Sequence, residues 1–138
     1  MISLNKSILI VLCILLGLAV GCGSGNKIKV SGHATFSDDD SPLTAGTVVL
    51  ESETTRVMGE LNNKGYFALG ELRDGDGVPL GQYRVTISGA REQLPNGFPG
   101  KYFVDSKYER PDTSGLTFEA KKGGPNTFDI KVDRPANP

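Results

Sequence analysis

The sequence predicts an all-β protein: a single antiparallel β-sandwich of about seven strands, preceded by an N-terminal signal helix. Three observations support this prediction. Apolar residues recur at every second position in several short runs, and the chain after residue 26 has no helical stripe of useful length. Eighteen glycines and eight prolines fall mainly between those runs, where turns need them. The chain also begins with an apolar segment that is too short to span a bilayer.

This N-terminal segment is typical of a secretory signal peptide. Lys6 is its one charged residue, and thirteen apolar or glycine residues run from Ile8 to Val20. A signal peptide has an apolar stretch of about 7 to 15 residues followed by small residues, whereas a membrane-spanning helix needs roughly 20. We therefore assign residues 1–21 to a signal peptide and leave them out of the fold prediction.

Cys22 directly follows Ala19, Val20 and Gly21, and this order resembles the lipobox of bacterial lipoproteins. The resemblance implies cleavage just before Cys22 and a diacylglyceryl group on its thiol, which makes Cys22 the predicted lipid attachment site. The other cysteine, Cys13, would leave with the signal peptide, and a lone exported thiol would be a liability unless it is modified. The alternative is ordinary cleavage nearby, which leaves Cys22 as a free thiol.

Residues 22–26 form a short flexible tether in this interpretation, because Gly23 to Asn26 are small or polar. Several acyl chains on one cysteine anchor a protein stably, whereas one chain binds only marginally. The predicted location is the bacterial cell envelope, with the protein exported and lipid-anchored. By resemblance to lipoprotein sorting, Gly23 in place of an aspartate favours the outer membrane in a cell with two membranes.

The mature chain, residues 22–138, fits one domain, with a body over 27–134 and a C-terminal tail over 135–138. Fifteen basic residues less Lys6 leave fourteen against sixteen acidic ones, a balance of −2. A nucleic-acid-binding domain carries a clustered basic face, so no nucleic-acid partner is predicted.

The predicted strands lie, in order, within KIKVSGHATF, GTVVLES, RVMGEL, GYFALGEL, GQYRVTI, LTFEA and NTFDIKV. One face of each strand is apolar and the other is polar or small. The link NNKG, Asn62 to Gly65, predicts a tight hairpin turn, because asparagine and glycine tolerate positive φ. The residues predicted to face inward are Ile28, Val30, Ala34, Phe36, Val48, Leu50, Tyr83, Val85, Ile87, Leu116, Phe118, Ala120, Phe128, Ile130 and Val132.

Several of these stretches resemble a known family. VSGHATF, SPLTAGTVVL, NNKGYFAL and LGQYRVTI look like the carboxypeptidase regulatory-like, or transthyretin-like, module of exported bacterial proteins. The later stretch KYERPDTSGLTFEAKKGGPNTFDIKV is similar to the end of a group of small single-domain lipoproteins of unassigned function. The resemblance covers nearly all of Ile28 to Asp133 and implies a transthyretin-like, Ig-like sandwich. Its motifs are turn and core patterns, which specify a fold but hardly any chemistry.

His33 is the only histidine, and it lies on the polar side of the first predicted strand. A general base needs a nucleophile or an orienting carboxylate, and a metal site usually needs several ligands. A hydrolase with the transthyretin fold has a cluster of histidines, an arginine and a C-terminal Tyr-Arg-Gly-Ser motif, whereas this chain ends in RPANP. We therefore predict a solvent-facing or rim histidine, with no catalytic residue, no cofactor and no metal site.

Two acidic loops offer oxygen ligands: Asp38 to Asp40 in SDDDSP, and Asp74 with Asp76 in RDGDGVP. Calcium takes six to eight oxygen ligands, but DGDG lacks the other positions of an EF-hand loop. Aspartate also tightens turns through its own side chain, which is the simpler interpretation. Calcium binding would be favoured if the two loops met at one end of the sandwich.

The long segment 90–115 joins two strands and contains Phe98, Tyr102, Phe103 and Tyr108. Connections of more than about 12 to 15 residues without structure of their own are often functional. The aromatic residues, beside several basic ones, could form a surface that binds carbohydrate or peptide. They could instead pin the loop against an open sheet face or edge, and we favour this role because the chain has no tryptophan and part of the segment belongs to the family pattern.

The predicted function is that of a non-enzymatic, membrane-anchored envelope lipoprotein that acts as a structural or protein-interaction module. Its predicted partners are the membrane, through the N-terminal lipid, and an envelope protein or glycan. The alternative is a carbohydrate- or peptide-binding module that uses the 90–115 loop. An enzyme has no support in the sequence, which contains no Ser/His/Asp arrangement, no Gly-rich phosphate loop and no zinc ligand set.

Overall fold

The computed structural model describes residues 26–136 except 72 and 125. The predicted signal helix, Cys22 and most of the predicted tether lie outside the described residues. Within 26–71, 73–124 and 126–136, the secondary structure is almost entirely β, and the single helical element is one short 3₁₀ turn. None of the described helical residues forms a helix that is long and apolar enough to cross a membrane.

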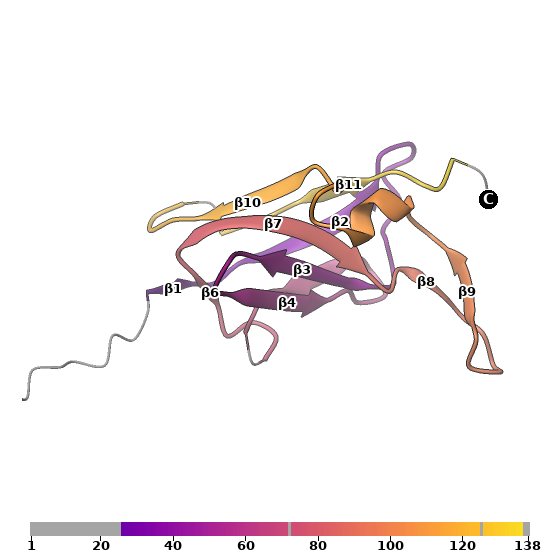
Figure 1. Cartoon of the computed structure of the whole chain (residues 1–138), viewed down its shortest axis with the longest axis horizontal. Helices are drawn as coiled ribbons and strands as arrows, with labels where there is room; N and C mark the ends of the chain where they lie inside the picture. Colours follow the sequence, from indigo (N-terminus) through magenta and orange to yellow (C-terminus); the bar gives the residue numbers. More distant parts are fainter. Residues whose placement is uncertain (1–25, 72, 125, 137–138) are drawn as a thin grey trace, which may run out of the picture.

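The described elements follow one another along the chain as shown in Figure 1. They are β1 (Lys27–Ile28), β2 (Ser31–Phe36), β3 (Thr47–Glu51), β4 (Arg56–Glu60), β5 (Tyr66–Ala68), β6 (Val78–Pro79), β7 (Gly81–Ser88), β8 (Arg91–Gln93), β9 (Pro99–Tyr102), η2 (Ser106–Glu109), β10 (Leu116–Ala120) and β11 (Ile130–Val132).

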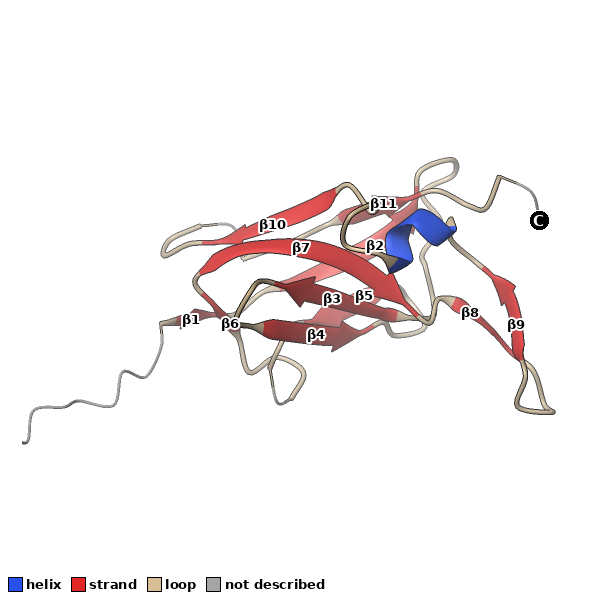
Figure 2. Ribbon diagram, in the orientation of Figure 1, coloured by secondary structure: helices blue, strands red, loops and turns tan. Residues whose placement is uncertain are grey.

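Two sheets form the sandwich and confirm the predicted fold class. One sheet has the strand order β10-β7-β3-β4, and the other has the order β11-β2-β5. Figure 2 shows the first sheet in front of the second, with β1 and β6 at one end and the β8–β9 hairpin at the other. We call the end that carries the hairpin and the last described residues the distal end.

The core lies between the two sheets and follows the predicted alternation. Twelve of the fifteen residues predicted to face inward are buried. The other three, Ile28, Leu116 and Phe128, are partly buried against the same cluster. The alternation of apolar and polar residues therefore identified the inner face of each predicted strand.

One strand pair departs from the otherwise antiparallel pattern. β11 pairs with β2 in parallel, with Ile130 opposite Ala34 and Val132 opposite Phe36. β10 ends at the same end of the sandwich at which β2 begins (Figure 1). The chain therefore crosses to the second sheet there and enters β11 in the direction of β2.

The NNKG turn is tight, as predicted, but the strands on its two sides belong to different sheets. The Asn62 side-chain oxygen accepts hydrogen bonds from the backbone N–H groups of Lys64 and Tyr66, and Gly65 has a φ of 80°. β4, before the turn, pairs with β3, whereas β5, after it, pairs with β2. The turn thus carries the chain around the edge of the sandwich rather than closing a hairpin within one sheet.

A methyl group at Gly32 should strongly destabilise the fold. A Cβ atom there would lie 1.9 Å from the Phe128 carbonyl oxygen and 2.6 Å from the Phe67 ring. We expect Gly32→Ala to lower the free energy of unfolding by about 3 kcal/mol, measured by urea unfolding, because the backbone of residue 128 would have to move. Ser31→Ala, at an exposed position on the same strand, is the control and should change little. Equal midpoints for the two variants would contradict the close packing of residue 128 on β2.

Candidate functional site

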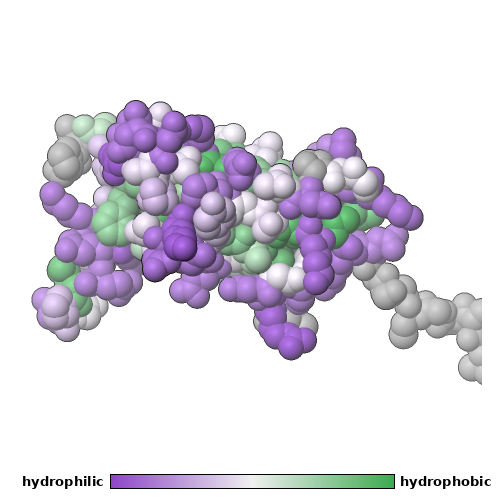
Figure 3. All heavy atoms as spheres, turned by 180° about the vertical axis from the view of Figure 1, so that it is seen from behind, coloured by the Kyte–Doolittle hydropathy of each residue, from purple (hydrophilic) through white to green (hydrophobic). Residues whose placement is uncertain are grey.

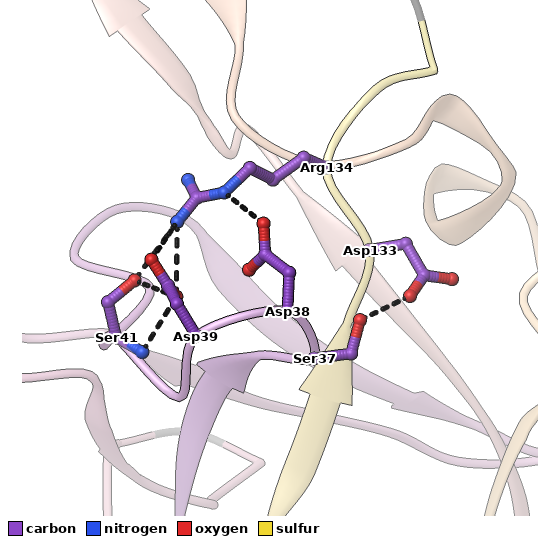
Figure 4. A network of polar contacts seen from close by, with 6 residues as sticks. All are labelled: Ser37, Asp38, Asp39, Ser41, Asp133 and Arg134. Carbon is purple, nitrogen blue, oxygen red and sulfur yellow. Dashed lines mark hydrogen bonds and ion pairs between the residues drawn. The ribbon is translucent and has the colours of Figure 1, made fainter.

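Segments far apart in the sequence meet at the distal end. They are the turn after β2, the residues that follow β11, and η2, which lies between β9 and β10. Figure 4 shows the first two of these segments, joined by hydrogen bonds and ion pairs. This polar cluster is the densest group of charged contacts in the described part of the chain, so we analyse it first.

Arg134 is the centre of one half of the cluster. Its Nε donates to Asp38 Oδ2 at 2.9 Å, and its Nη2 donates to Asp39 Oδ2 at 3.1 Å and to the Ser41 hydroxyl at 3.0 Å. The guanidinium carbon also lies 3.7 Å from the centre of the Phe36 ring. Arg134 thus covers the end of β2 and occupies the carboxylates of the acidic turn.

Asp133 is the centre of the other half. One carboxylate oxygen accepts a hydrogen bond from the Ser37 hydroxyl at 2.5 Å, and the other accepts from Lys107 Nζ at 2.7 Å and the Tyr108 hydroxyl at 3.0 Å. The Asp133 carbonyl accepts from the backbone N–H of Asp105 at 2.9 Å. Asp133 therefore links β2, β11 and η2 through one side chain and its backbone.

The cluster favours the charged form of two of its carboxylates. Hydrogen bonds from the Ser41 side chain and backbone, with the nearby Arg134, lower the pKa of Asp39 to about 2. A hydrogen bond from Lys107, with further ones from Ser37 and Tyr108, lowers the pKa of Asp133 to about 2. A general acid or base works best with a pKa near the operating pH. These carboxylates are therefore suited to holding the structure and not to transferring protons.

Sequence reasoning identified the acidic turn but missed its partners. Lys131 contacts Asp40, and Arg134 binds the other two aspartates of the turn. Both basic residues lie at or just beyond the end of the last predicted strand. The aspartates, in the same way, follow the end of the first predicted strand. That match of opposite charges is the signal that could have found the cluster, but it requires knowing that the two strands are parallel neighbours.

The two acidic loops that were considered for calcium binding do not meet. The loop that carries Asp74 and Asp76 joins β5 to β6 and lies away from the turn after β2 (Figure 1). Asp76 Oδ1 accepts a hydrogen bond from the backbone N–H of Glu71 at 2.8 Å. Among the described residues, no three His, Cys, Asp or Glu side chains form a group that could hold a metal ion. The condition that would favour calcium binding is therefore not met.

His33 lies on the outer side of β2, as predicted, and is partly buried by its neighbours. Its ring stacks on the Tyr66 ring, with centroids 4.3 Å apart and planes 19° from parallel. Nε2 is 2.8 Å from the Lys64 carbonyl oxygen, and the His33 backbone N–H donates to Asp129 Oδ1. These contacts fix His33 to β5 and to the residues before β11.

An open hollow also lies over β3, β7 and β10. Its charged side chains are Glu51, Glu53, Glu119 and Arg84, and Glu51 pairs with Arg56 at 3.3 Å. The lining mixes polar and apolar surface and carries both signs of charge. We assign no site to it.

The 90–115 segment has structure of its own and divides into two parts. The second part, from residue 103 onward, packs on the sandwich: Val104 and Tyr108 are buried and Phe103 lies against the core. The Ser114 hydroxyl donates to the Val85 carbonyl at 2.5 Å and holds the segment against β7. The predicted pinning role is therefore correct for Phe103 and Tyr108.

The first part is the β8–β9 hairpin, which projects from the distal end (Figure 2). Phe98 and Tyr102 are 69% and 42% exposed. In Figure 3, which shows the molecule from behind, hydrophilic residues cover much of the surface and hydrophobic atoms are visible on this projection. The hairpin is thus the part of the 90–115 segment that can meet a partner.

Comparison with known proteins adds one resemblance of shape. No family model matches the chain, and no curated protein matches it. Among solved structures, the chain is similar to a crystal structure of BcpA, the major pilin subunit of Bacillus cereus, at 11% sequence identity and a TM-score of 0.47. The match covers 80% of this chain and 30% of that chain, so this chain spans under a third of the pilin's length. The assignment of an all-β sandwich rests on the strand pairing described above.

Asp133→Asn should reduce the loss of stability in acid. The pKa of Asp133 is about 2 in the folded protein, against an ordinary value of 3.8. The stability that comes from this carboxylate is therefore present above its ordinary pKa and is lost as the pH falls toward 2. We expect the urea midpoint of the wild type to fall more between pH 5 and pH 2 than that of Asp133→Asn.

Asp74→Asn is the control for this experiment, because the Asp74 carboxylate makes no ion pair with a described residue. It should keep the acid dependence of the wild type. The same dependence in the wild type and in Asp133→Asn would contradict a role for the Asp133 contacts in stability.

Tyr108→Ala and Tyr102→Ala should separate the two parts of the 90–115 segment. Tyr108 is 4% exposed, so its truncation leaves a cavity and removes a hydrogen bond to Asp133, and we expect a loss of about 3 to 5 kcal/mol. Tyr102→Ala removes little more than a cation–π contact with Arg91 and should cost about 0.5 to 1 kcal/mol. Urea unfolding followed by circular dichroism measures both. Similar losses in the two variants would show that the hairpin is as integral to the fold as η2.

Proposed function

We propose that this chain is a non-enzymatic lipoprotein of the bacterial cell envelope, held on a membrane by lipid at Cys22. Its body is a transthyretin-like sandwich that acts as a structural or protein-interaction module. One observation carries the non-enzymatic part: the polar side chains that could have supplied chemistry are engaged in holding the fold. His33 stacks on Tyr66, while Asp39 and Asp133 have lowered pKa values in the ion pairs of the distal end.

The placement of the described N-terminal residues supports the anchoring part. β1 lies at the end of the sandwich opposite the β8–β9 hairpin (Figure 1). The tether of residues 22–26 would reach at most about 18 Å when fully extended. A lipid on Cys22 would therefore hold the sandwich close to the bilayer. The resemblance to exported transthyretin-like modules and to small lipoproteins supports the same proposal.

A carbohydrate- or peptide-binding module is the second candidate, and the exposure of Phe98 and Tyr102 favours it. Two of the four aromatic residues of the segment, Phe103 and Tyr108, pack inward and leave two rings for a ligand. Arg91 lies over the Tyr102 ring, 5.6 Å from its centre, and covers part of that ring. The aromatic surface available to a ligand is therefore smaller than the one predicted from four aromatic residues.

Cys22→Ser should give a product whose N-terminal peptide carries no lipid. The lipid would be attached through the Cys22 sulfur, so its loss leaves no predicted anchor on the mature chain. Mass spectrometry of the N-terminal peptide measures this outcome. Cys13→Ser is the matched control, because Cys13 lies within the predicted signal peptide, and it should leave the product lipidated. An unmodified Cys22 sulfur in the wild-type product would falsify the proposal.

A further inference from the structure

The β8–β9 hairpin, residues 91–102, ends in a tip without charge. Its residues 93–100 read QLPNGFPG, and the charged side chains of the hairpin, Arg91, Glu92 and Lys101, stand at its base. Phe98 in the tip is the most exposed large apolar side chain of the described residues, at 69%. The tip therefore presents an aromatic ring and two prolines to solvent above a base with a net positive charge.

Hydrogen bonds hold the tip in one conformation. The Gly97 backbone N–H donates to the Leu94 carbonyl at 3.0 Å, and the Phe98 backbone N–H donates to the Asn96 side-chain oxygen at 3.1 Å. Gly97 has a φ of 78°, which favours glycine, and the prolines on each side restrict their own φ angles. The exposed ring is thus presented by an ordered turn, which lowers the entropy lost on contact with a partner.

The base of the hairpin is fixed to the sandwich, so the tip points away from it. The Phe103 backbone N–H donates to the Ala90 carbonyl at 2.9 Å, and Arg91 lies over the Tyr102 ring. Figure 2 shows the hairpin turning away from the long axis of the two sheets. The charged residues below the tip are Arg91 and Glu92 on β8 and Lys101 on β9.

We propose that this tip inserts into the interface of a lipid bilayer. Phe98 would enter the boundary between headgroups and acyl chains, while Arg91 and Lys101 stay at the level of anionic headgroups. Aromatic residues are enriched at membrane interfaces, and basic residues close to the surface add attraction to anionic lipids. An uncharged aromatic tip above a base with one net positive charge fits this environment in both polarity and charge.

The size of the tip favours a bilayer over a protein partner. A stable protein interface buries about 800 Å² on each side, whereas one aromatic side chain buries about 150 to 250 Å². A small contact becomes significant when a second attachment keeps the two surfaces together. The inference rests here on the proposed lipid at Cys22, because that lipid would keep the domain beside a membrane. Since the hairpin turns sideways from the long axis, a sandwich that lies along the bilayer brings both of its ends to the surface (Figure 2).

The absence of tryptophan from the chain allows a direct test. Phe98→Trp places a single indole fluorophore in the tip, and the protein as purified from membranes is mixed with an excess of vesicles. The vesicles contain three parts phosphatidylcholine to one part phosphatidylglycerol, with bromine on the acyl chains as a quencher. We expect the emission of the Phe98→Trp variant to move to shorter wavelength and to lose intensity, because an indole at the membrane interface lies close to the brominated chains. Vesicles of phosphatidylcholine alone should give a smaller change.

Tyr66→Trp is the matched control, because Tyr66 is an aromatic residue that is 53% exposed on a sheet strand and not on the hairpin. It should not be quenched. Adding Lys101→Gln to Phe98→Trp should weaken the response to anionic vesicles and leave the response to neutral ones.

The outcomes separate the two proposals. Flotation of the Phe98→Trp variant with the vesicles, without quenching of its indole, would overturn the insertion of the tip and leave the lipid anchor in place. Quenching of that indole without stable flotation would support insertion of the tip and contradict the lipid anchor at Cys22. A shift of its emission on adding a glycan or a protein, with none on adding vesicles, would overturn the bilayer as the partner.

Discussion

The parallel pairing of β11 with β2 is the contact on which the distal end depends. β11 has three residues and pairs with β2 alone, so its ladder is short. Ile130 and Val132 are buried and supply the favourable energy, since each buried apolar side chain contributes about 1.5 to 3 kcal/mol. Exposed ion pairs such as those of Arg134 add little to stability, because water and salt screen them. Their main effect is therefore on register, because a slip by one residue would turn the buried side chains outward.

The same contact also positions the base of the hairpin. Asp133, directly after β11, binds Tyr108 of η2, and Tyr108 fills the core at this end. Val104, just before η2, is buried, and the Phe103 backbone N–H donates to the carbonyl of Ala90, which directly precedes β8. The two ends of the hairpin thus leave the sandwich from fixed points. Contacts among β2, β11 and η2 thereby determine where an otherwise exposed aromatic tip is presented.

The alternation of apolar residues was sufficient to predict the strands that line the core, because a half-buried strand must alternate with period two. The alternation alone could not predict that Tyr108 is a core residue, since η2 is a single turn with no periodic pattern. Nor could it show the role of Arg134, whose partners lie 93 to 96 residues away in the chain. Pairs between distant surface residues depend on which strands are neighbours, and that information is absent from local patterns. The short strands β8 and β9 also lack a periodic pattern, because β8 has three residues and none is apolar, while β9 begins with proline and glycine.

The distribution of polar contacts suggests where interactions with other molecules are concentrated. Side chains that are already paired, such as Asp133 with Lys107 and Tyr108, lose those contacts if they bind a ligand, so recognition there would carry a cost in stability. The hairpin tip has no such cost, because its exposed ring at Phe98 can be covered without breaking a bond within the fold. At the other end, the residues before β1 would connect the sandwich to the proposed lipid. In the two proposals together, the contacts with the membrane belong to the two ends of the sandwich.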